Sequence, residues 1–452
     1  MNTLPSVQVQ RYVSRDSKVT FVFSDVSKQV TIGDHTYLIG QTIGKSNALV
    51  MDAYPIGETH KNTKLPPLCL KIAEHGLIDL DDKKIQYIND HPDDFTRIYN
   101  YGSNVTFNTD IIFDYFSFGK SIDICIMEKV STTLSQVCKN VETSQEQFSL
   151  RFLNFITQRL LAIINDLTEH GYYYIDLKPA NIGLIDAGNH VSLKLIDVDS
   201  ITDDTRHALG TYYTSGKVSP NINITRLQYL NIFFTVISLL FFDHVHVMCS
   251  VDYSKFNYDE AMRLYMNWFN PNNSKQHSKW LYSSEVNCVY YKYALLIGTY
   301  KIIENYLSKP DFSMNEVLYD FNEIVKAVSN VITNNQDHKS YYFEFIAQCL
   351  VVMFLIFLCS PKDIPKLVNK YMKSTLISYQ SKDFEVANTS VKDIFIEPQV
   401  LIGVSIVNAM RRYITSYCND QSCNALRKYG DYFLNTDSTK NDISYNQRIL
   451  FD

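Results

Sequence analysis

The sequence has little glycine, no excess of basic charge and no apolar run long enough to cross a bilayer. Glycine accounts for only 15 of 452 residues, so glycine-rich loops and tight turns should be few. The formal net charge is −6, which argues against a nucleic-acid-binding protein, since such proteins need a basic face. The longest apolar run, Phe345–Cys359, is shorter than the roughly 20 residues of a membrane span. We expect a buried helix there and no stable membrane span, with a membrane-inserted segment as the alternative.

Signals for secretion and for a disulfide or zinc framework are also missing. The nine cysteines are scattered, and no second pair accompanies Cys418 and Cys423 to complete a zinc site. The first residues, Met1–Val7, lack the basic and then apolar segments of a signal peptide. These absences predict free thiols in an intracellular, soluble protein.

The composition that is present is that of an ordinary globular protein with many aromatic residues. Hydrophobic residues make up 46% and charged residues 20% of the chain, which excludes a disordered protein. The chain contains 32 tyrosines and 26 phenylalanines, so we expect large aromatic cores. Its length of 452 residues allows a two-lobed domain with a further extension.

Short runs typical of β-strands dominate the sequence up to about residue 130. One charged stretch, Leu77–Asn89, favours a helix that should end at His91, before Pro92. This succession predicts a small, mostly antiparallel lobe around a single helix. The expected strands are Val19–Phe23, Thr36–Gly40, Ala48–Ala53, Leu68–Ile72, Ile111–Phe116 and Ile122–Lys129.

Helical periodicity replaces this pattern after Val130. The stretch Phe148–His170 places its apolar residues on one broad face, and Gly171 is a suitable C-terminal stop. One clear strand, Leu193–Ile196, follows, and the sequence contains no internal repeat. Further helices are expected over 225–241 and most of 285–435, and a domain boundary near Pro310 or Asn334–His338.

A short polar loop between these elements carries the clearest chemical pattern. It reads Asp176-Leu177-Lys178-Pro179-Ala180-Asn181, and the strand after it ends in Asp197-Val198-Asp199. Phosphoryl transfer requires a carboxylate near the attacking hydroxyl and oxygen ligands for a metal ion, and Asp176, Asn181 and Asp197 are of these types. The alternative is that Asp176 and Asn181 only cap a turn. The loop and the segment after it resemble the catalytic loop and the metal-binding segment of protein kinases.

The resemblance covers roughly residues 36–240 and implies an α+β, bilobal protein-kinase-like fold. It implies a small antiparallel β lobe at 36–130 and a large helical lobe at 131–310, after an N-terminal extension at 1–35. The region 311–452 would be a C-terminal helical extension that packs against the large lobe, or alternatively a helical domain that binds a partner.

The implied activity is that of a serine/threonine protein kinase, because a lysine at the position of Lys178 is the choice of that class. The resemblance implies ATP and Mg²⁺ (or Mn²⁺) as cofactors and a protein as substrate. Asp176 would orient the substrate hydroxyl or accept its proton, and Lys178 would neutralise charge on the transferred phosphoryl group. Asn181 and Asp197 would hold magnesium.

The nucleotide would be held by residues earlier in the chain. Lys71, in the apolar run Leu68–Ile72, would orient the α- and β-phosphates, with an edge-strand lysine facing water as the alternative. The expected lining of the site also includes a degenerate glycine-rich loop and a segment beside the adenine. An ordinary hairpin is the alternative for the loop. These residues are Gly44, Ser46 and Val50 in the loop, Met127 beside the adenine pocket, and the backbone from Glu128 to Val130 against the base.

Departures from the family pattern bear on regulation. The glutamate that pairs with the lysine in kinases is not obvious: Asp82 stands at or near its position, and a solvated helix face is the alternative. Ile175 replaces an arginine, which predicts activity without phosphorylation of the activation loop. Asp199 replaces a glycine and could add an acidic metal ligand. The aspartate expected early in the next helix is replaced around Arg226–Gln228.

Two other functions stay open at this point. A kinase-like fold can act on a non-protein substrate or transfer a nucleotidyl group, and a pseudokinase can serve as a binding scaffold. The weak glycine loop and the missing glutamate and arginine favour the scaffold, whereas the retained catalytic set favours the enzyme. Diverged loops around an intact catalytic set resemble kinases of large DNA viruses and bacterial effectors, which would imply a host cytoplasm.

Overall fold

The computed structural model describes residues 9–24, 27–45, 47–56, 65–113, 116–138, 147–204 and 223–239, together with short parts of 349–396. The chain divides into two compact units. The first comprises Met1–Thr132, Gly183–Ile185 and Ser192–Ile201, and the second comprises Thr133–Ile182, Asp186–Val191 and Thr202–Asp452.

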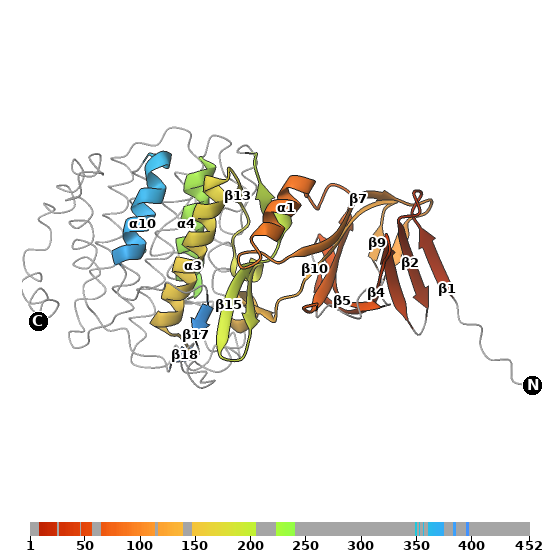
Figure 1. Ribbon diagram of the computed structural model, residues 1–452, viewed down its shortest axis with the longest axis horizontal. Helices are drawn as coiled ribbons and strands as arrows, with labels where there is room; N and C mark the ends of the chain where they lie inside the picture. Colours follow the sequence, from red (N-terminus) through yellow and green to blue (C-terminus); the bar gives the residue numbers. More distant parts are fainter. Residues whose placement is uncertain are drawn as a thin grey trace, which may run out of the picture. The chain divides into compact units, whose positions relative to one another are not determined.

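The first unit is built on one curled, antiparallel sheet of eight strands (Figure 1). The strands are β1 (Val9–Val13), β2 (Val19–Ser24), β3 (Lys28–Ile32), β4 (His35–Lys45), β5 (Ala48–Ile56), β6 (Leu68–Glu74), β7 (Ile98–Thr106) and β10 (Ser121–Glu128). Their order is β1-β2-β3-β4-β5-β6-β10-β7, so β1 to β6 form a continuous meander and β10 lies between β6 and β7. The strand β6 is therefore interior, with a partner on each side.

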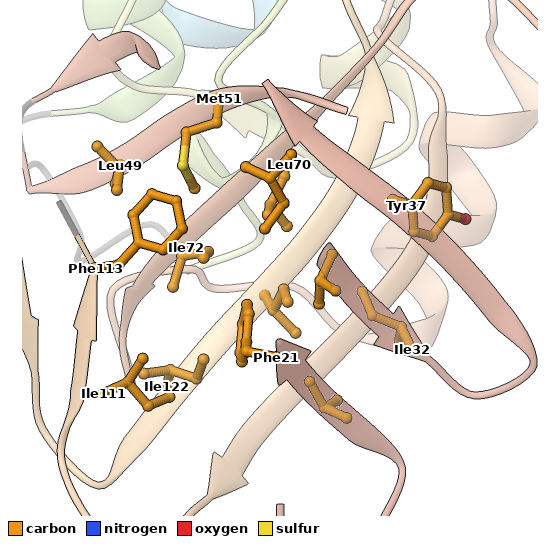
Figure 2. Close-up of a cluster of buried hydrophobic side chains, with 14 of the residues drawn as sticks. Phe21, Ile32, Tyr37, Leu49, Met51, Leu70, Ile72, Ile111, Phe113 and Ile122 are labelled. Carbon is orange, nitrogen blue, oxygen red and sulfur yellow. The ribbon is translucent and has the colours of Figure 1, made fainter. Parts of the chain in front are cut away.

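Alternating apolar side chains build the core of this unit (Figure 2). In β2, Phe21 and Phe23 are buried while Val22 between them is half-buried, which is the two-residue period of a strand with one covered face. A hairpin of β8 (Ile111–Phe113) and β9 (Phe116–Phe118) adds further side chains to the same cluster. The rings of Phe23 and Phe113 meet edge to face with their centroids 4.7 Å apart. The expectation of an aromatic core is confirmed here.

One helix, α1 (Asp82–Asp90), lies between β6 and β7 in the chain. Asp81 caps its N-terminus by accepting a hydrogen bond from the Lys84 amide at 2.8 Å, and His91 caps its C-terminus, before Pro92. The predicted helix is confirmed, but it begins at Asp82 rather than at Leu77. An aspartate favours the non-helical cap position, because its side chain satisfies an amide that the first turn leaves unpaired.

A buried aspartate ties three segments of the sheet together. The Asp123 carboxylate in β10 pairs with the His75 ring at 2.9 Å and accepts hydrogen bonds from the amides of Gly76 at 2.7 Å and Asn104 at 2.8 Å. Its side chain is only 1% exposed. Burial alone would raise the pKa of Asp123, but these hydrogen bonds outweigh burial and lower the pKa. The carboxylate thus holds the end of β6 and the bulged part of β7 against β10.

The second unit contains the long described helices α3 (Leu150–Glu169), α4 (Ile224–Leu239) and α10 (Ile364–Ser374). Helices α3 and α4 pack together, and Asn165 of α3 accepts a hydrogen bond from the Tyr229 hydroxyl of α4. Asn165 also donates to Asn369 of α10 at 3.3 Å. None of the helices in the described ranges combines the length and the apolarity that a bilayer span requires.

Most of the strands and helices predicted in the described ranges are confirmed with shifted ends. Strands β2, β4, β5, β6, β10 and β15 and helices α3 and α4 cover predicted runs. The single strand predicted over Ile111–Phe116 is wrong, because these residues belong to a hairpin of two short strands. The sequence does not predict β7, because Ile98–Thr106 is mostly polar and shows no apolar alternation. In the structure most of these residues are half-buried or exposed.

The sheet continues across the boundary predicted at residue 35. Strand β3 pairs with β4, with Ile32 opposite His35, so the strands of the predicted N-terminal extension belong to the same sheet as the predicted small lobe. The bilobal kinase-like fold and the predicted regions 131–310 and 311–452 stay predictions. Most of 285–435, where further helices are predicted, and most of Phe345–Cys359 lie outside the described residues.

Candidate active site

Lys71 lies in the middle of the interior strand β6. Its neighbours across the sheet are Val50 in β5 and Cys125 in β10. All of β6 except Glu74 is buried, and Lys71 itself is 8% exposed. The edge-strand alternative is therefore wrong, and a buried ammonium group in this position needs counter-charges.

Two carboxylates supply these counter-charges. The Lys71 ammonium lies 2.6 Å from Oδ1 of Asp197 and 2.5 Å from Oδ1 of Asp199. Both aspartates follow the strand β15 (His190–Leu195), in and just before the 3₁₀ turn Val198–Ser200. The structure thus brings together Lys71 and Asp197, two residues that the sequence predicts for one site, across a separation of 126 positions.

The two carboxylates differ in their environment. The side chain of Asp197 is 32% exposed, whereas that of Asp199 is 11% exposed. Burial raises the pKa of Asp199 to about 6, and the charges of Lys71 and Asp197 act on it in opposite directions. Burial would lower the pKa of Lys71, but Asp199 and Asp197 together outweigh burial and raise it, so the lysine is charged at neutral pH. A metal ion from solvent therefore reaches the Asp197 carboxylate more readily than the Asp199 carboxylate.

The loop Asp176–Asn181 forms a second cluster, which belongs to the second unit. The Lys178 ammonium lies 2.6 Å from Oδ2 of Asp176. The Asn181 side-chain amide donates to the backbone carbonyl and to Oδ2 of Asp176, each at 2.9 Å. The 3₁₀ turn Pro179–Asn181 sets this spacing, and the side chains of Asp176 and Lys178 are 25% and 28% exposed. The three predicted residues of the loop therefore lie together around one partly exposed carboxylate.

Helix α4 anchors the strand that enters this loop. The Tyr174 amide donates to Oε1 of Gln228 at 3.3 Å, and the Gln228 side-chain amide donates to the Thr168 hydroxyl of α3 at 2.7 Å. Gln228 is only 1% exposed. It lies in the range Arg226–Gln228, where the resemblance stated above would place an aspartate. Gln228 supplies an uncharged, buried hydrogen-bond acceptor there.

Met127 and Glu128 end β10, and both are buried. The Glu128 carboxylate lies 2.8 Å from the Lys194 ammonium through both oxygens. The backbone amides of Glu128 and Lys129 donate to the carbonyls of Arg97 at 2.8 Å and Pro67 at 2.7 Å. These two amides are therefore bonded within the protein, and the adenine contact of this segment stays a prediction.

The predicted phosphate loop is only partly described. Gly44 lies near the end of β4, opposite Val50 in β5. A Cβ atom at Gly44 would lie 3.5 Å from the Cβ of Val50, an ordinary contact, so packing does not require a glycine there. The ammonium of Lys45 lies 4.1 Å from the centroid of the Phe116 ring. Ser46 lies outside the described residues, and the phosphate contacts of the loop stay predictions.

The sequence does not predict the roles of two buried residues of the first unit, Lys194 and Gly183. Lys194 is a buried lysine in β15, and its only local signal is its position between two leucines in a strand. Gly183 follows the loop, and a Cβ atom there would lie 2.5 Å from Cγ1 of Val130 and 2.7 Å from Cγ2 of Ile196. The close approach of Val130 requires a glycine, and no local pattern in the sequence indicates it.

Comparison with known proteins adds little to this geometry. No protein-family model matches the chain, and no curated protein matches its sequence. Among solved structures, the kinase domain of PknI from Mycobacterium tuberculosis is similar with a TM-score of 0.27 and 14% sequence identity, over 45% of this chain and 73% of that chain. The interpretation of the site therefore depends on its own residues.

Proposed function

We propose that this protein is an ATP-dependent phosphotransferase that transfers the γ-phosphoryl group to serine or threonine hydroxyls of a protein. The observation that carries the proposal is the buried cluster in which Lys71 meets Asp197 and Asp199. Phosphoryl transfer needs a cation that can neutralise phosphate charge and a carboxylate that can bind a metal ion, and groups of both types lie in direct contact here. A second observation, the Asp176–Lys178–Asn181 cluster, supports the same reaction.

The residues fit magnesium and a nucleoside triphosphate. Carboxylate and amide oxygens are ligands that magnesium prefers, and manganese accepts the same donors. Asp197 and Asn181 would supply such oxygens, and Lys71 would orient the α- and β-phosphates. When bound, the metal ion neutralises charge on the phosphate oxygens.

Asp176 and Lys178 would then act on the substrate hydroxyl that accepts the phosphoryl group. The Asp176 carboxylate, which Asn181 holds in one orientation, accepts the proton of the substrate hydroxyl. The hydroxyl oxygen bonds to the γ-phosphorus while the bond from that phosphorus to the β–γ bridging oxygen breaks. ADP leaves, and the proton passes from Asp176 to solvent. The Lys178 ammonium shifts from the Asp176 carboxylate toward the transferred phosphoryl group and neutralises part of the negative charge on that group.

The test is phosphoryl transfer from ATP labelled in the γ-phosphate, with magnesium or manganese and a generic protein acceptor. We expect Asp176→Ala and Asp197→Ala each to lower the rate at least ~10²-fold, because they remove the carboxylate at the hydroxyl and a metal ligand. The matched control is Asp110→Ala, which removes an exposed carboxylate of the first unit. Transfer that survives both active-site substitutions would contradict the proposal.

The same assay separates the other functions. Label that enters the acceptor from the α-phosphate and not from the γ-phosphate would mean nucleotidyl transfer. Label on a small molecule alone would mean a kinase with a non-protein substrate. No transfer by the wild type under either metal ion, with retained binding of a partner, would favour a scaffold.

A further inference from the structure

The counter-charge of Lys71 comes from an unexpected part of the chain. The sequence places Asp79 and Asp81 just before helix α1 and Asp82 at its first position, and Asp82 stands at or near the expected position of the lysine's partner. In the structure, the ion pairs of Lys71 among the described residues are with Asp197 and Asp199.

The acidic residues near α1 have other roles or face solvent. The Asp79 carboxylate lies 2.7 Å from the Lys84 ammonium. Asp81 caps the helix through the Lys84 amide. The side chain of Asp82 is exposed at the first position of the helix. The solvated-face alternative for Asp82 is the one that this geometry supports.

The buried face of α1 carries a positive charge instead. Its buried residues are Lys84, Tyr87 and Ile88, and the Lys84 side chain is 5% exposed. A second ammonium group cannot neutralise Lys71, and bringing it close would cost Coulomb energy. The helix therefore offers no counter-ion from its buried positions.

Asp199 is suited to be the permanent partner of Lys71. Its carboxylate lies 2.5 Å from the ammonium and its side chain is 11% exposed, compared with 32% for Asp197. When Asp197 takes a metal ion, Lys71 would lose part of its neutralisation, and Asp199 would remain. A buried charge pair of this kind fixes the position of both groups, since separating them leaves an unpaired buried charge.

We propose that Asp199 is the positioning residue of Lys71 and replaces the acidic partner that a helix would supply. The inference rests on the proposed function, in which Lys71 orients the phosphates. It has a consequence for regulation: displacement of helix α1 would not release the lysine, because Lys71 is held from the segment that also carries Asp197.

The test combines kinetics with nucleotide binding in the absence of metal. We expect Asp199→Asn to weaken the binding of ATP in EDTA by ~10-fold or more and to lower kcat/KM for ATP, with Asp199→Glu recovering part of both. Asp82→Ala should change neither by more than about twofold, since its side chain is exposed. An effect of Asp82→Ala as large as that of Lys71→Met would overturn the inference, as would wild-type behaviour of Asp199→Asn.

A double-variant cycle separates positioning of the lysine from binding of the metal. If Asp199 acts through Lys71, Asp199→Asn should have no further effect on ATP binding or on magnesium dependence in a Lys71→Met background. A full additional loss of magnesium-dependent binding in that background would make Asp199 a metal ligand and overturn the inference. The double variant removes the charges of Lys71 and Asp199 together, so no buried ammonium group is left short of a partner. It can therefore be measured even where Asp199→Asn alone fails to fold.

The two proposals can fail separately. Wild-type protein that binds ATP but transfers no phosphate would contradict the proposed function, and the binding cycle in EDTA would still decide the role of Asp199. If the wild type transfers phosphate and Asp199→Asn binds ATP and turns it over as the wild type does, the positioning role is overturned. The proposed function then still stands.

Discussion

The Asp123 carboxylate accepts hydrogen bonds from two backbone amides that belong to different segments, and it does so in a nearly water-free position. In Asp123→Asn, one of its oxygens becomes an NH₂ group that would face a backbone donor. We expect this change to lower the free energy of unfolding by about 2–3 kcal/mol, because a charge-assisted hydrogen bond is lost and a buried donor is left unpaired. Urea denaturation at neutral pH measures the difference.

The same residue predicts a pH dependence. The pKa of Asp123 is lowered in the folded state from its ordinary value of 3.8. Its contribution to stability is therefore fully present above that value and is lost as the pH falls through the folded-state pKa. The stability difference between the wild type and Asp123→Asn should shrink in acid, whereas the exposed control Asp110→Asn should follow the wild type. A difference that stays constant down to about pH 2 would contradict this account.

At the scale of the elements, the pair of Glu128 and Lys194 joins the end of β10 to β15. Both side chains are largely buried, at 9% and 11% exposed. We expect Lys194→Met to lower the free energy of unfolding by about 3–5 kcal/mol, because it leaves the Glu128 carboxylate buried without its partner. Chemical denaturation measures the loss.

The double variant Lys194→Met/Glu128→Gln tests whether the unpaired Glu128 charge causes this loss of stability. It removes both charges and should recover much of the stability that Lys194→Met loses. Lys18→Met is a matched control, because Lys18 pairs with Asp16 at 3.8 Å in an exposed position and its removal should leave unfolding nearly unchanged. A double variant no more stable than Lys194→Met would show that the pair contributes through packing rather than charge.

For the whole molecule, the proposed function predicts stabilisation by ATP with magnesium. A ligand at 100 times its Kd adds about 2.7 kcal/mol to the free energy of unfolding when it binds only the folded chain. Thermal unfolding should therefore shift upward with ATP and magnesium, and the shift should be smaller with ATP and EDTA. Lys71→Met should lose most of the shift, and Lys18→Met should keep it. An equal shift in both variants would speak against a nucleotide site at Lys71.

Much of the local structure could be predicted because its signals are local. The apolar alternation of β2 and β6 and the capping aspartate and proline around α1 act within a few residues. Strand β7 lacks such a signal: its polar residues are held in the sheet by the partner β10 and by the Asp123 carboxylate. The activity without loop phosphorylation that Ile175 suggests stays a prediction, since residues 205–222 lie outside the described ranges.

By itself, the sequence determined the types of most elements in the described ranges and the order of Lys71, Asp176, Asn181 and Asp197 along the chain. Only the tertiary structure decided which acid neutralises Lys71, because that choice depends on strand register and burial across a separation of 128 positions. It likewise joined the first three strands to the main sheet and paired Lys194 with Glu128. A charge that water would solvate in a short peptide must find a partner in a buried strand, and the fold selects that partner.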